Sequence, residues 1–515
     1  MDKIVTAAQM RAAERRAEQA GATTAQLMQN AGTAAARVIA EALARGERQA
    51  RVLVLCGPGA NGGDGMIVAK RLSEWGHQVA AYTFRRDEPL PPRPLVVRHA
   101  DDADLTALRR MLADATVVVD ALLGTGRARP IEGDLAAILD LVRAVAAARA
   151  VVALDLPSGV DPDDGAADPR TVAATITITF GYYKRGLIIG EGAALAGHVV
   201  LVPIGLDPAA GDDVDLWRVD EEDARVRIPA RPRDANKYSA GAVLVVAGSR
   251  RFTGAPQLAT LGAARAGAGL VTLATGASTH PILASHLLEP TFLVLKDDQD
   301  GVLDPVAAVA AIKEAAARYK ALLFGPGLAQ SAATVQLLET LLCEDTLPAE
   351  LPVVVDAEGL NALSKIANWS ARTRHRLVLT PHSGELGRLT GLGHAEIEAR
   401  RLDIAPEQAR AWNAVVVLKG NPTVTASPDG QAAVNTTGGP NLATGGTGDV
   451  LGGVIAALIA QGAAPFDAAV AGVYLHGRAG DLLAERDGDR GTLAGDLPPV
   501  IPGVIKAVLQ GAQSA

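Results

Sequence analysis

The sequence predicts an α/β protein of more than one domain, in which helices cover both faces of largely parallel sheets. Short runs of β-branched residues alternate with helical segments along most of the chain, which is the pattern of βαβ units. Several of these runs are followed by glycines and a carboxylate, and parallel strands bring such ends to one edge of a sheet. A length of 515 residues also exceeds what one hydrophobic core supports.

The composition is that of a folded protein and disfavours several classes of function. Hydrophobic residues make up 49% and charged residues 21%, and the net charge of -8 argues against nonspecific binding to nucleic acids or acidic membranes. No apolar run approaches the roughly 20 residues that span a bilayer, and residues 1–6 lack the apolar core of a signal peptide. Cys56 and Cys343 lie far apart and suit buried thiols in a reducing compartment. We therefore expect a cytoplasmic protein that binds neither nucleic acid nor membranes.

The first half of the chain is predicted to form one parallel sheet. Helices are expected over residues 6–19 and 24–45, and a glycine loop over residues 57–65 is expected to precede a helix that resumes at Met66. The expected strands are residues 51–56, 78–84, 115–120, 150–155, 175–180 and 198–202, the last two near one edge.

Three loops after these strands carry candidate functional residues. Residues 57–65, 120–126 and 155–159 each contain glycine and a carboxylate, and each follows the C-terminal end of a strand. Glycine and proline could be simple turn residues. Three carboxylates collected at one sheet edge instead favour a ligand site.

Residues 57–62 also match the dinucleotide fingerprint G-x-G-x-x-G between a strand and a helix. The ribose-binding acid expected about 20 residues later is missing, since Arg85 and Arg86 follow the next strand. These arginines could select a 2′-phosphate or belong to a solvated loop. A hydride-transferring dehydrogenase therefore stays an alternative for this half.

Residues 1–210 resemble the NAD(P)H-hydrate epimerase family. The motifs that carry the resemblance are Leu27-Met-Gln-Asn-Ala-Gly32, Gly59-Ala-Asn-Gly-Gly-Asp-Gly65, Asp120-Ala-Leu-Leu-Gly-Thr-Gly126, Asp155-Leu-Pro-Ser-Gly159 and Phe180-Gly-Tyr-Tyr-Lys184. The resemblance implies a Rossmann-like three-layer domain that interconverts the R and S epimers of NADHX and NADPHX, the hydrated forms of reduced nicotinamide cofactors.

The same resemblance implies roles for individual residues. Asn61, Asp120 and Ser158 match a potassium site and offer only oxygen ligands, which a hard cation prefers. Asp155 matches a substrate-contacting acid and is the expected proton-transfer residue, with Lys184 as a helper. The residues expected to contact the hydrate are Ala60, Asn61, Gly62, Gly63, Asp64, Gly124, Thr125, Gly126, Arg127, Ala128, Arg129, Pro130 and Asp155. Ala60 departs from the family, which usually has a second Asn at this position.

The second half starts a new α/β series after a Pro-, Gly- and charge-rich segment, residues 203–232, which reads as a domain boundary. Helices are expected over residues 256–268, 450–460 and 467–485, and a hairpin is expected across residues 428–430. The expected strands are residues 242–247, 270–274, 321–324, 352–355, 377–379, 414–418, 424–427 and 431–434.

A glycine-dense stretch, residues 438–449, precedes a charge-free apolar run and ends in Asp449. Glycines let backbone amides approach an anion, and a helix N-terminus adds a partial positive charge. An acid at that point can activate a hydroxyl for attack on phosphorus. The alternative is an Asp that only caps its helix. No Walker A motif occurs in this half.

Residues 225–515 resemble the ADP-dependent NAD(P)H-hydrate dehydratase family, which implies a ribokinase-like three-layer domain. The motifs are Gly254-Ala255, Gly325-Pro-Gly327, Asp356-Ala-Glu-Gly-Leu-Asn361, Pro381-His-Ser-Gly-Glu385, Lys419-Gly420 and Gly445-Gly-Thr-Gly-Asp449. Two stretches depart from the family pattern, residues 236–241 and 437–442.

The combined resemblance implies a fused repair enzyme, an epimerase joined to a dehydratase that acts on the S hydrate and releases AMP and phosphate from ADP. Asp449 is expected to accept the hydroxyl proton, and Mg²⁺ to accompany the nucleotide. The expected nucleotide contacts are Lys419, Gly420, Asn421, Pro422, Thr423 and Gly448, and the expected hydrate contacts are Ala255, Gly327, His382 and Asp449. We expect a homo-oligomer whose ligands are NADHX, NADPHX and ADP. The alternatives are a ribokinase-like small-molecule kinase fused to a dinucleotide-binding domain, and a non-enzymatic scaffold.

Overall fold

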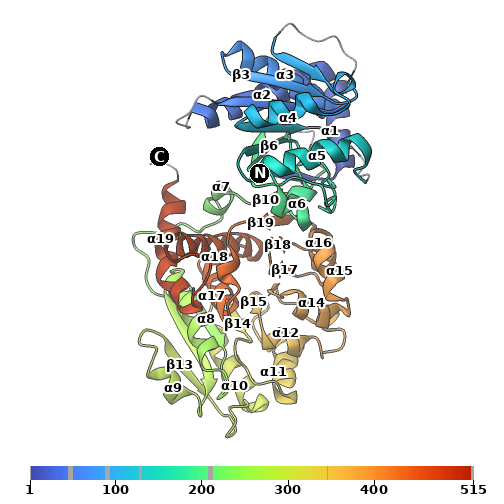
Figure 1. Ribbon diagram of the computed structural model, residues 1–515. Helices are drawn as coiled ribbons and strands as arrows, with labels where there is room; N and C mark the ends of the chain where they lie inside the picture. The colour runs from blue at the N-terminus through green and yellow to red at the C-terminus, as the bar shows by residue number, and fades with distance from the viewer. Residues whose placement is uncertain are drawn as a thin grey trace. The chain divides into compact units, whose positions relative to one another are not determined.

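The computed structural model describes residues 2–44, 50–86, 93–126, 130–206, 211, 213–344 and 346–511. The chain forms two compact units, the N-terminal unit Asp2–Asp215 and the C-terminal unit Leu216–Ala515. Each unit is a sheet between two layers of helices, which confirms the predicted α/β class (Figure 1). Among the described residues, no helix is long and apolar enough to cross a membrane.

The sheet of the N-terminal unit has the order β4-β3-β2-β5-β6-β7-β9, with every neighbouring pair parallel. Its strands are β2 (Arg51–Cys56), β3 (Gln78–Thr83), β4 (Leu95–Arg98), β5 (Val117–Ala121), β6 (Ala150–Leu154), β7 (Ile176–Phe180) and β9 (His198–Val202). The order reverses between β2 and β5, where open α/β sheets form a ligand crevice beyond the carboxyl ends of the strands. The predicted strands are confirmed to within two residues.

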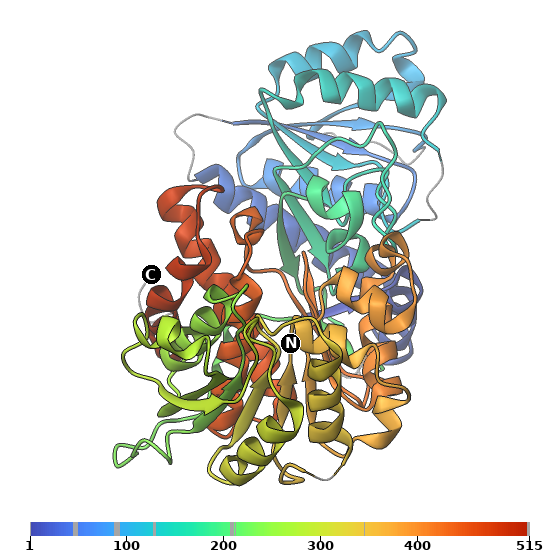
Figure 2. The same ribbon diagram turned by 90° about the horizontal axis from the view of Figure 1, so that it is seen from below.

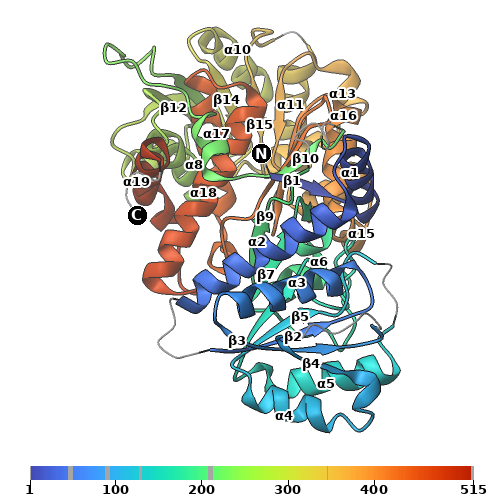
Figure 3. The same ribbon diagram turned by 90° about the horizontal axis from the view of Figure 1, so that it is seen from above.

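Helices α2 (Thr24–Ala44) and α3 (Ala60–Glu74) cover one face of this sheet, and α4 (Thr106–Asp114) and α5 (Gly133–Ala146) cover the other (Figure 3). A separate parallel pair joins β1 (Asp2–Val5) to β8 (Tyr183–Lys184). Helix α1 (Ala7–Gln19) follows β1 directly, and α6 (Gly190–Leu195) precedes β9.

The predicted glycine loop over residues 57–65 is wrong in its second part. Helix α3 begins at Ala60, so three of the glycines lie in the helix and the helix does not wait until Met66. A Cβ at Gly62 would stand 1.9 Å from the Gly57 carbonyl oxygen, and one at Gly65 would stand 2.7 Å from Ala121 Cβ. Close packing against the sheet, rather than a loop conformation, requires these glycines.

The sheet of the C-terminal unit has the order β13-β12-β11-β14-β15-β16-β17-β18-β19-β10. All pairs are parallel except the predicted hairpin, in which β18 runs antiparallel to β17 and β19. The strands are β10 (Leu216–Arg218), β11 (Ala242–Val246), β12 (Leu270–Gly276), β13 (Thr291–Leu295), β14 (Ala321–Phe324), β15 (Val353–Val355), β16 (Leu377–Leu379), β17 (Val415–Leu418), β18 (Thr423–Ala426) and β19 (Ala432–Asn435). Sequence patterns missed β10 and β13.

Two layers of helices enclose this second sheet (Figures 1 and 2). One contains α8 (Gly254–Arg265), α17 (Thr447–Ala460), α18 (Pro465–Asp487) and α19 (Leu497–Gln510). The other contains α10 (Pro305–Ala316), α11 (Ala332–Cys343), α12 (Glu358–Leu363), α14 (Ser383–Thr390) and α16 (Arg401–Trp412). Shorter helices complete the unit: α7 (Glu221–Arg225), α9 (His280–Ala284), α13 (Trp369–Arg372) and α15 (His394–Ala399).

Helix α17 is the central helix of the layer that also contains α8, α18 and α19. Its side chains are buried from Val450 to Ala460 and belong to one continuous hydrophobic core with α8, α18 and the sheet. A helix that is apolar on all sides is stable only when neighbours surround it. The packing therefore fixes the position of its N-terminal turn, which carries Asp449.

Candidate active sites

In the N-terminal unit, Asp155 and Lys184 form a buried ion pair. The Lys184 ammonium lies 2.5 Å from Asp155 Oδ1 and donates to Thr179 Oγ1 at 3.1 Å and to the Phe180 carbonyl oxygen at 2.7 Å. Only 1% of Lys184 is exposed. Three acceptors match the three ammonium protons. Lys184 is therefore fully engaged in holding Asp155.

Asp155 itself is held in an unusual backbone conformation directly after β6. Its φ of 66° lies in the left-handed region, which is uncommon for a residue with a side chain. Its amide donates to the Ile178 carbonyl oxygen of the neighbouring strand at 2.7 Å. Strained residues of this kind cluster at functional sites.

Asp64 is a second buried carboxyl near this pair. It lies in the second turn of α3 and is 7% exposed. Burial, followed by the negative charge of Asp155, raises the pKa of Asp64 to about 8. Glu14 of α1 belongs to the same group of charges, and burial also raises its pKa. At neutral pH this site holds Asp64 mainly in its protonated form.

Asn61, Asp120 and Ser158, which the family resemblance matches to a potassium site, are buried and are linked through hydrogen bonds that include Leu123. Ser158 Oγ donates to Asp120 Oδ1 at 2.7 Å, and the Ser158 amide donates to Asp120 Oδ2 at 2.9 Å. Asn61 Nδ2 donates to the carbonyl oxygens of Leu123 and Leu154 at 2.6 and 2.9 Å. Asn61 Oδ1 is buried without a hydrogen-bond partner. Such an atom is costly unless something binds it.

Of the remaining expected hydrate contacts, Gly124 lies against this cluster. A Cβ at Gly124 would lie 3.0 Å from Asn61 Cβ, so these two segments touch. Gly62 and Gly63 are buried inside α3, Ala60 and Gly126 are exposed, and Thr125 is half-buried. Pro130 is also exposed. Arg127, Ala128 and Arg129 lie outside the described residues.

Arg86 has a structural contact that bears on the dehydrogenase alternative. Its guanidinium donates to the carbonyl oxygens of Gly57 and Gly59 at 2.8 and 3.1 Å. Arg86 therefore stabilises the turn between β2 and α3. This structural role accounts for the arginine without the 2′-phosphate contact that a dehydrogenase would need.

In the C-terminal unit, Asp449 lies in the first turn of α17, as the sequence predicts. Gly446 caps this helix with a φ of 98°, a conformation that glycine adopts without strain. Burial, followed by the negative charge of Asp356, raises the pKa of Asp449 to about 7. A carboxylate with a pKa near the working pH is suited to general-base catalysis.

Lys419 directly follows β17 and lies beside two carboxylates. Its ammonium donates to Asp356 Oδ1 at 2.8 Å and lies 3.7 Å from Glu385 Oε2. Burial opposes its charge, but the carboxylates of Asp356 and Glu385 outweigh burial and raise the pKa of Lys419. A Cβ at Gly448 would lie 3.3 Å from this ammonium, which places the ammonium at the first turn of α17.

The expected hydrate contacts Ala255 and Gly327 lie side by side where the strand order reverses between β11 and β14. A Cβ at Gly327 would stand 3.0 Å from Ala255 Cβ. His382 lies elsewhere on the same strand-end edge, before α14. Its Nδ1 accepts hydrogen bonds from the amides of Gly384 and Glu385, which leaves Nε2 as the donor in the neutral ring.

A cavity of about 320 Å³ lies beside the N-terminus of α17. It is lined by the loop after β17, the segment before α17 and the inner side of α18. Of the predicted nucleotide contacts, Lys419, Gly420, Asn421, Thr423 and Gly448 line it, and Pro422 lies within the same loop. The fold thus brings the residues predicted to contact the nucleotide to one cavity.

Sequence reasoning missed His476 of α18, which also lines this cavity. Its Nε2 lies 2.9 Å from the Thr447 carbonyl oxygen, and burial lowers its pKa to about 4. The ring is therefore neutral and donates to that oxygen. A histidine in the middle of a buried helix gives no local sequence signal. Asp356 and Glu385 belong to motifs of the dehydratase resemblance but have no expected role in the sequence analysis, although Asp356 directly follows a predicted strand.

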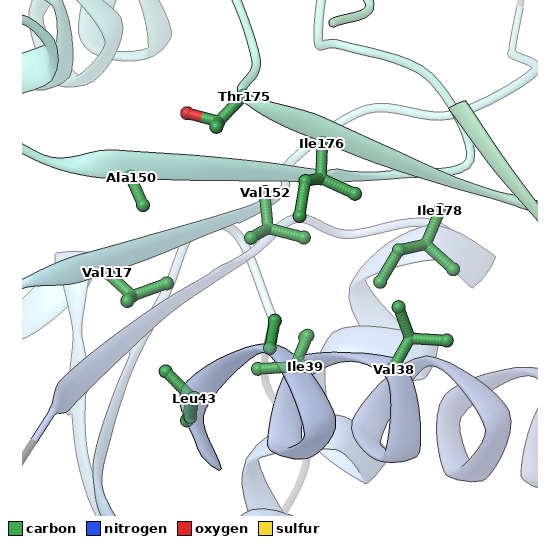
Figure 4. A pocket seen from close by; sticks show the side chains of 10 residues that line it. Val38, Ile39, Leu43, Val117, Ala150, Val152, Thr175, Ile176 and Ile178 are labelled. Atoms are coloured by element: carbon green, nitrogen blue, oxygen red, sulfur yellow. The ribbon is translucent and has the colours of Figure 1, made fainter. Parts of the chain in front are cut away.

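A second cavity, of about 130 Å³, lies in the N-terminal unit (Figure 4). Figure 4 shows Val38, Ile39 and Leu43 of α2 facing the first residues of β5, β6 and β7. This is the amino edge of the sheet, whereas Asp120 and Asp155 lie at its carboxyl edge. Its lining is almost entirely apolar.

Among the described residues, no group of three His, Cys, Asp or Glu side chains is arranged to hold a metal ion.

Comparison with known proteins identifies the family. A family model described as NAD(P)H-hydrate dehydratase matches residues 243–502, and one described as YjeF-related protein N-terminus matches residues 24–186. The bifunctional NAD(P)H-hydrate repair enzyme Nnr of Moorella thermoacetica is 38% identical over 499 residues, covering 93% of this chain and 92% of that protein. The chain belongs to the bifunctional NAD(P)H-hydrate repair enzyme family.

Another bifunctional NAD(P)H-hydrate repair enzyme, from Escherichia coli, is 33% identical over 483 residues, covering 93% of this chain and 88% of that protein. Among solved structures, the ADP/ATP-dependent NAD(P)H-hydrate dehydratase from Bacillus subtilis, crystallised with ATP and Mg²⁺, is 35% identical, covers 56% of this chain and 96% of that chain, and has a TM-score of 0.48. Membership of the repair enzyme family confirms the predicted bifunctional class, with an epimerase domain and a dehydratase domain. It favours this class over the dehydrogenase, kinase and scaffold alternatives.

Proposed function

We propose that this chain repairs hydrated nicotinamide cofactors at two sites. The N-terminal unit interconverts the R and S epimers of NADHX and NADPHX, and the C-terminal unit dehydrates the S form with ADP. The observation that carries the proposal is the placement of Asp449, a carboxylate whose pKa is raised to about 7, beside Lys419 at the N-terminus of a buried helix. This arrangement unites a base, a cation and helix amides at one point.

Dehydration is slow without help because hydroxide is a poor leaving group. In the proposed reaction Asp449 accepts the proton of the ring hydroxyl, whose oxygen forms a bond to the terminal phosphorus of ADP as the bond to AMP breaks. The resulting phosphate ester leaves as phosphate when its C–O bond breaks, the neighbouring ring carbon loses a proton, and the ring double bond forms again. The amides at residues 445–448 and the Lys419 ammonium would hold the phosphoryl group in transfer.

The cavity beside α17 supports the nucleotide assignment. Its volume and its lining by the loop of residues 419–423 suit the mononucleotide part of ADP. Arg401 fixes this loop by donating to the carbonyl oxygens of Leu418 and Pro422 at 3.3 and 2.6 Å. Mg²⁺ bound with ADP would neutralise phosphate charge during transfer. Ala255, Gly327 and His382 are assigned to the hydrate.

In the epimerase site, Asp155 is the proton-transfer residue and Lys184 positions it. The ammonium of Lys184 contacts Asp155 Oδ1, Thr179 Oγ1 and the Phe180 carbonyl oxygen, so its three protons are directed at these acceptors and it is suited to hold Asp155 in place. Asp64 and the segments at residues 60–63 and 124–126 would surround the hydrate.

The cluster of Asn61, Asp120 and Ser158 fits a potassium ion. Asn61 Oδ1 is a buried oxygen without a partner, and the Asp120 carboxylate has no ion pair among the described residues. K⁺ bound there would supply the positive charge that this carboxylate lacks. The three side chains would then join the loops after β5 and β6 to the start of α3.

The test uses separately purified R and S hydrates of NADH. With S hydrate and ADP, we expect the absorbance of reduced nicotinamide to return, and with R hydrate we expect consumption only through prior epimerisation. Asp449→Asn should stop the first reaction and keep epimerisation, whereas Asp155→Asn should do the reverse. Each variant thus keeps one activity, which shows that the loss is confined to the unit that carries the substitution, and circular dichroism of each variant checks that this unit is folded. A parent protein that restores no absorbance with either ADP or ATP would refute the dehydratase proposal.

A further inference from the structure

Four charged side chains meet at the carboxyl edge of the C-terminal sheet, and the reaction proposed above uses only two of them directly. Asp356 follows β15, Lys419 follows β17, Glu385 lies in α14 and Asp449 lies in α17. Strands β15, β16 and β17 are consecutive neighbours in the sheet, so their ends are adjacent. Asp356 and Glu385 take no direct part in the proposed reaction.

Asp356 is almost completely enclosed. Only 1% of it is exposed, and its Oδ1 accepts hydrogen bonds from Lys419 Nζ at 2.8 Å and from Thr380 Oγ1 at 2.7 Å. On its other side, a Cβ at Gly452 would lie 3.5 Å from Asp356 Oδ2, so this oxygen faces α17. A carboxylate enclosed in this way acts through Lys419 and does not touch a substrate.

Lys419 is held from a second direction by Glu385. Glu385 is itself fixed, because its Oε2 accepts a hydrogen bond from the His382 amide at 2.9 Å in the capping box of α14. A lysine side chain loses rotamer entropy when it is held in one place. Two fixed carboxylates offset this loss before the nucleotide arrives.

We propose that Asp356 is a positioning residue for phosphoryl transfer: together with Glu385 it holds the Lys419 ammonium at the first turn of α17, between Asp449 and the phosphoryl group. The inference rests on the proposed dehydratase function. It explains why a cation near a phosphate site is paired with carboxylates. The ammonium is placed in advance, which is how preorganised charge contributes to catalysis.

The same contacts determine the charge state of the base. Burial, then Asp356, raises the pKa of Asp449, Lys419 lowers it, and Glu385 raises it further. The other titratable groups near this cluster are His382 and His476, whose pKa values are lowered chiefly by burial, and Arg388 near Glu385. Both histidines are therefore neutral at pH 7. Removal of the Asp356 charge lowers the pKa of Asp449.

The test compares Asp356→Asn with Thr380→Val in the full chain. We expect Asp356→Asn to lower kcat for S-hydrate dehydration by about 10- to 100-fold, with a smaller change in KM, because a misplaced group costs rate rather than binding. The acidic limb of its kcat/KM profile should move to lower pH. Thr380→Val removes one hydrogen bond and no charge, so it should lower kcat less and leave that limb in place.

Two further measurements keep the outcome decisive. Asp223→Asn is the matched control, because Asp223 is also buried and faces Arg227 in the same unit but lies in α7, away from the site; it should keep kcat and the pH profile. Carbon NMR titration of Asp449, assigned with Asp449→Asn, should show a lower pKa in Asp356→Asn whether or not the parent dehydrates the hydrate. A parent without activity would thus overturn the proposed reaction alone. An Asp356→Asn protein with unchanged kcat, or with an unshifted Asp449 titration, would overturn the positioning role.

Discussion

The two glycine-rich segments of this chain look alike in sequence but use glycine for different physical reasons. Each joins a strand to a helix, and each ends near an acid that we assign to a site. In residues 57–65 close packing requires Gly62 and Gly65, since Cβ atoms there would collide with the Gly57 carbonyl and with Ala121. In residues 438–449 two glycines, Gly438 and Gly446, have φ angles of 90° and 98°. Here conformation, rather than space alone, selects glycine.

The acids of these segments differ in the same instructive way. Asp64 lies inside a helix without an ion pair among the described residues, and burial is the main cause that raises its pKa to about 8. Asp449 lies in the first turn of its helix, near Lys419 and Asp356, with a pKa raised to about 7. One acid keeps its proton at neutral pH, whereas the other is poised to lose it. A shared motif composition therefore does not imply shared chemistry.

The largest expected effect is that of Asp449→Asn on dehydration. Loss of a general base costs about 10²- to 10⁴-fold in rate, so kcat for the S hydrate with ADP should fall by that factor. In the parent, kcat/KM should rise as pH increases through about 7, where Asp449 loses its proton, and then level off. Timed assays of reduced nicotinamide absorbance, across roughly pH 5.5–9, measure the fall in kcat of the variant and the pH dependence of kcat/KM in the parent. Retention of more than a tenth of the parent rate would remove the assigned role.

Gly62→Ala tests the packing side of the comparison. The added Cβ would lie 1.9 Å from a backbone oxygen, so α3 must shift from the sheet, at a cost of about 3 kcal/mol or more in the free energy of unfolding of the N-terminal unit. Gly59→Ala is the matched control, because a Cβ there has nothing within 4 Å, and the loss of a favourable N-cap residue should cost at most about 1 kcal/mol. Denaturant unfolding followed by circular dichroism compares them. Equal stabilities of the two variants would show that close packing does not select Gly62.

Asp64→Asn tests the charge state of the buried acid through stability. Between pH 4 and 8 the unfolded chain has lost this proton while the folded chain keeps it, so parent stability falls as pH rises through that range. Each pKa unit is worth about 1.4 kcal/mol. The Asn variant lacks this slope and should gain stability relative to the parent as pH rises, by several kcal/mol at pH 8. Thermal unfolding of both proteins at pH 5 and pH 8 measures the difference, and parallel pH profiles would contradict it.

Gly446→Ala tests the conformational side. A φ of 98° is unfavourable for alanine by about 1–2 kcal/mol, and Leu258 Cδ1 would lie 2.5 Å from the new Cβ. Stability of the C-terminal unit should fall by about that amount. Gly445→Ala, where a Cβ has nothing within 4 Å, should change the free energy of unfolding by less than about 0.5 kcal/mol. If both variants lose the same stability, conformation is not what distinguishes Gly446.

The smallest expected effect concerns the edge of the N-terminal sheet that faces away from Asp155. Val152 faces the apolar cavity of about 130 Å³, whereas its neighbour Val151 packs in the core on the other face of the sheet. Val152→Ile should be neutral or stabilise by up to about 1 kcal/mol, since it fills space. Val151→Ile should destabilise by about 1 kcal/mol through overpacking. A calorimetric comparison of the pair measures the sign, and the reverse order would contradict the assignment of the two faces.

The sequence by itself determined most of the central strands of both sheets and the helices beside the candidate sites, because alternating β-branched runs and helical periodicity are local signals. It also placed Asp120 and Asp155 after strands, and Asp449 in the first turn of its helix, since parallel strands collect such ends at one edge. The tertiary structure decided the rest. Whether residues 60–65 form a loop or a helix depends on contacts with Gly57 and Ala121, which outweigh the low helix propensity of glycine.

Charge states likewise belong to the tertiary structure. The pairing of Lys419 with Asp356 joins residues 63 positions apart, and the protonation of Asp64 follows from burial and from Asp155 far along the chain. No local pattern contains such distances. A sequence therefore specifies which acids reach the edge of a sheet, and only the folded neighbourhood determines which of them keeps its proton, because desolvation and nearby charges set the pKa.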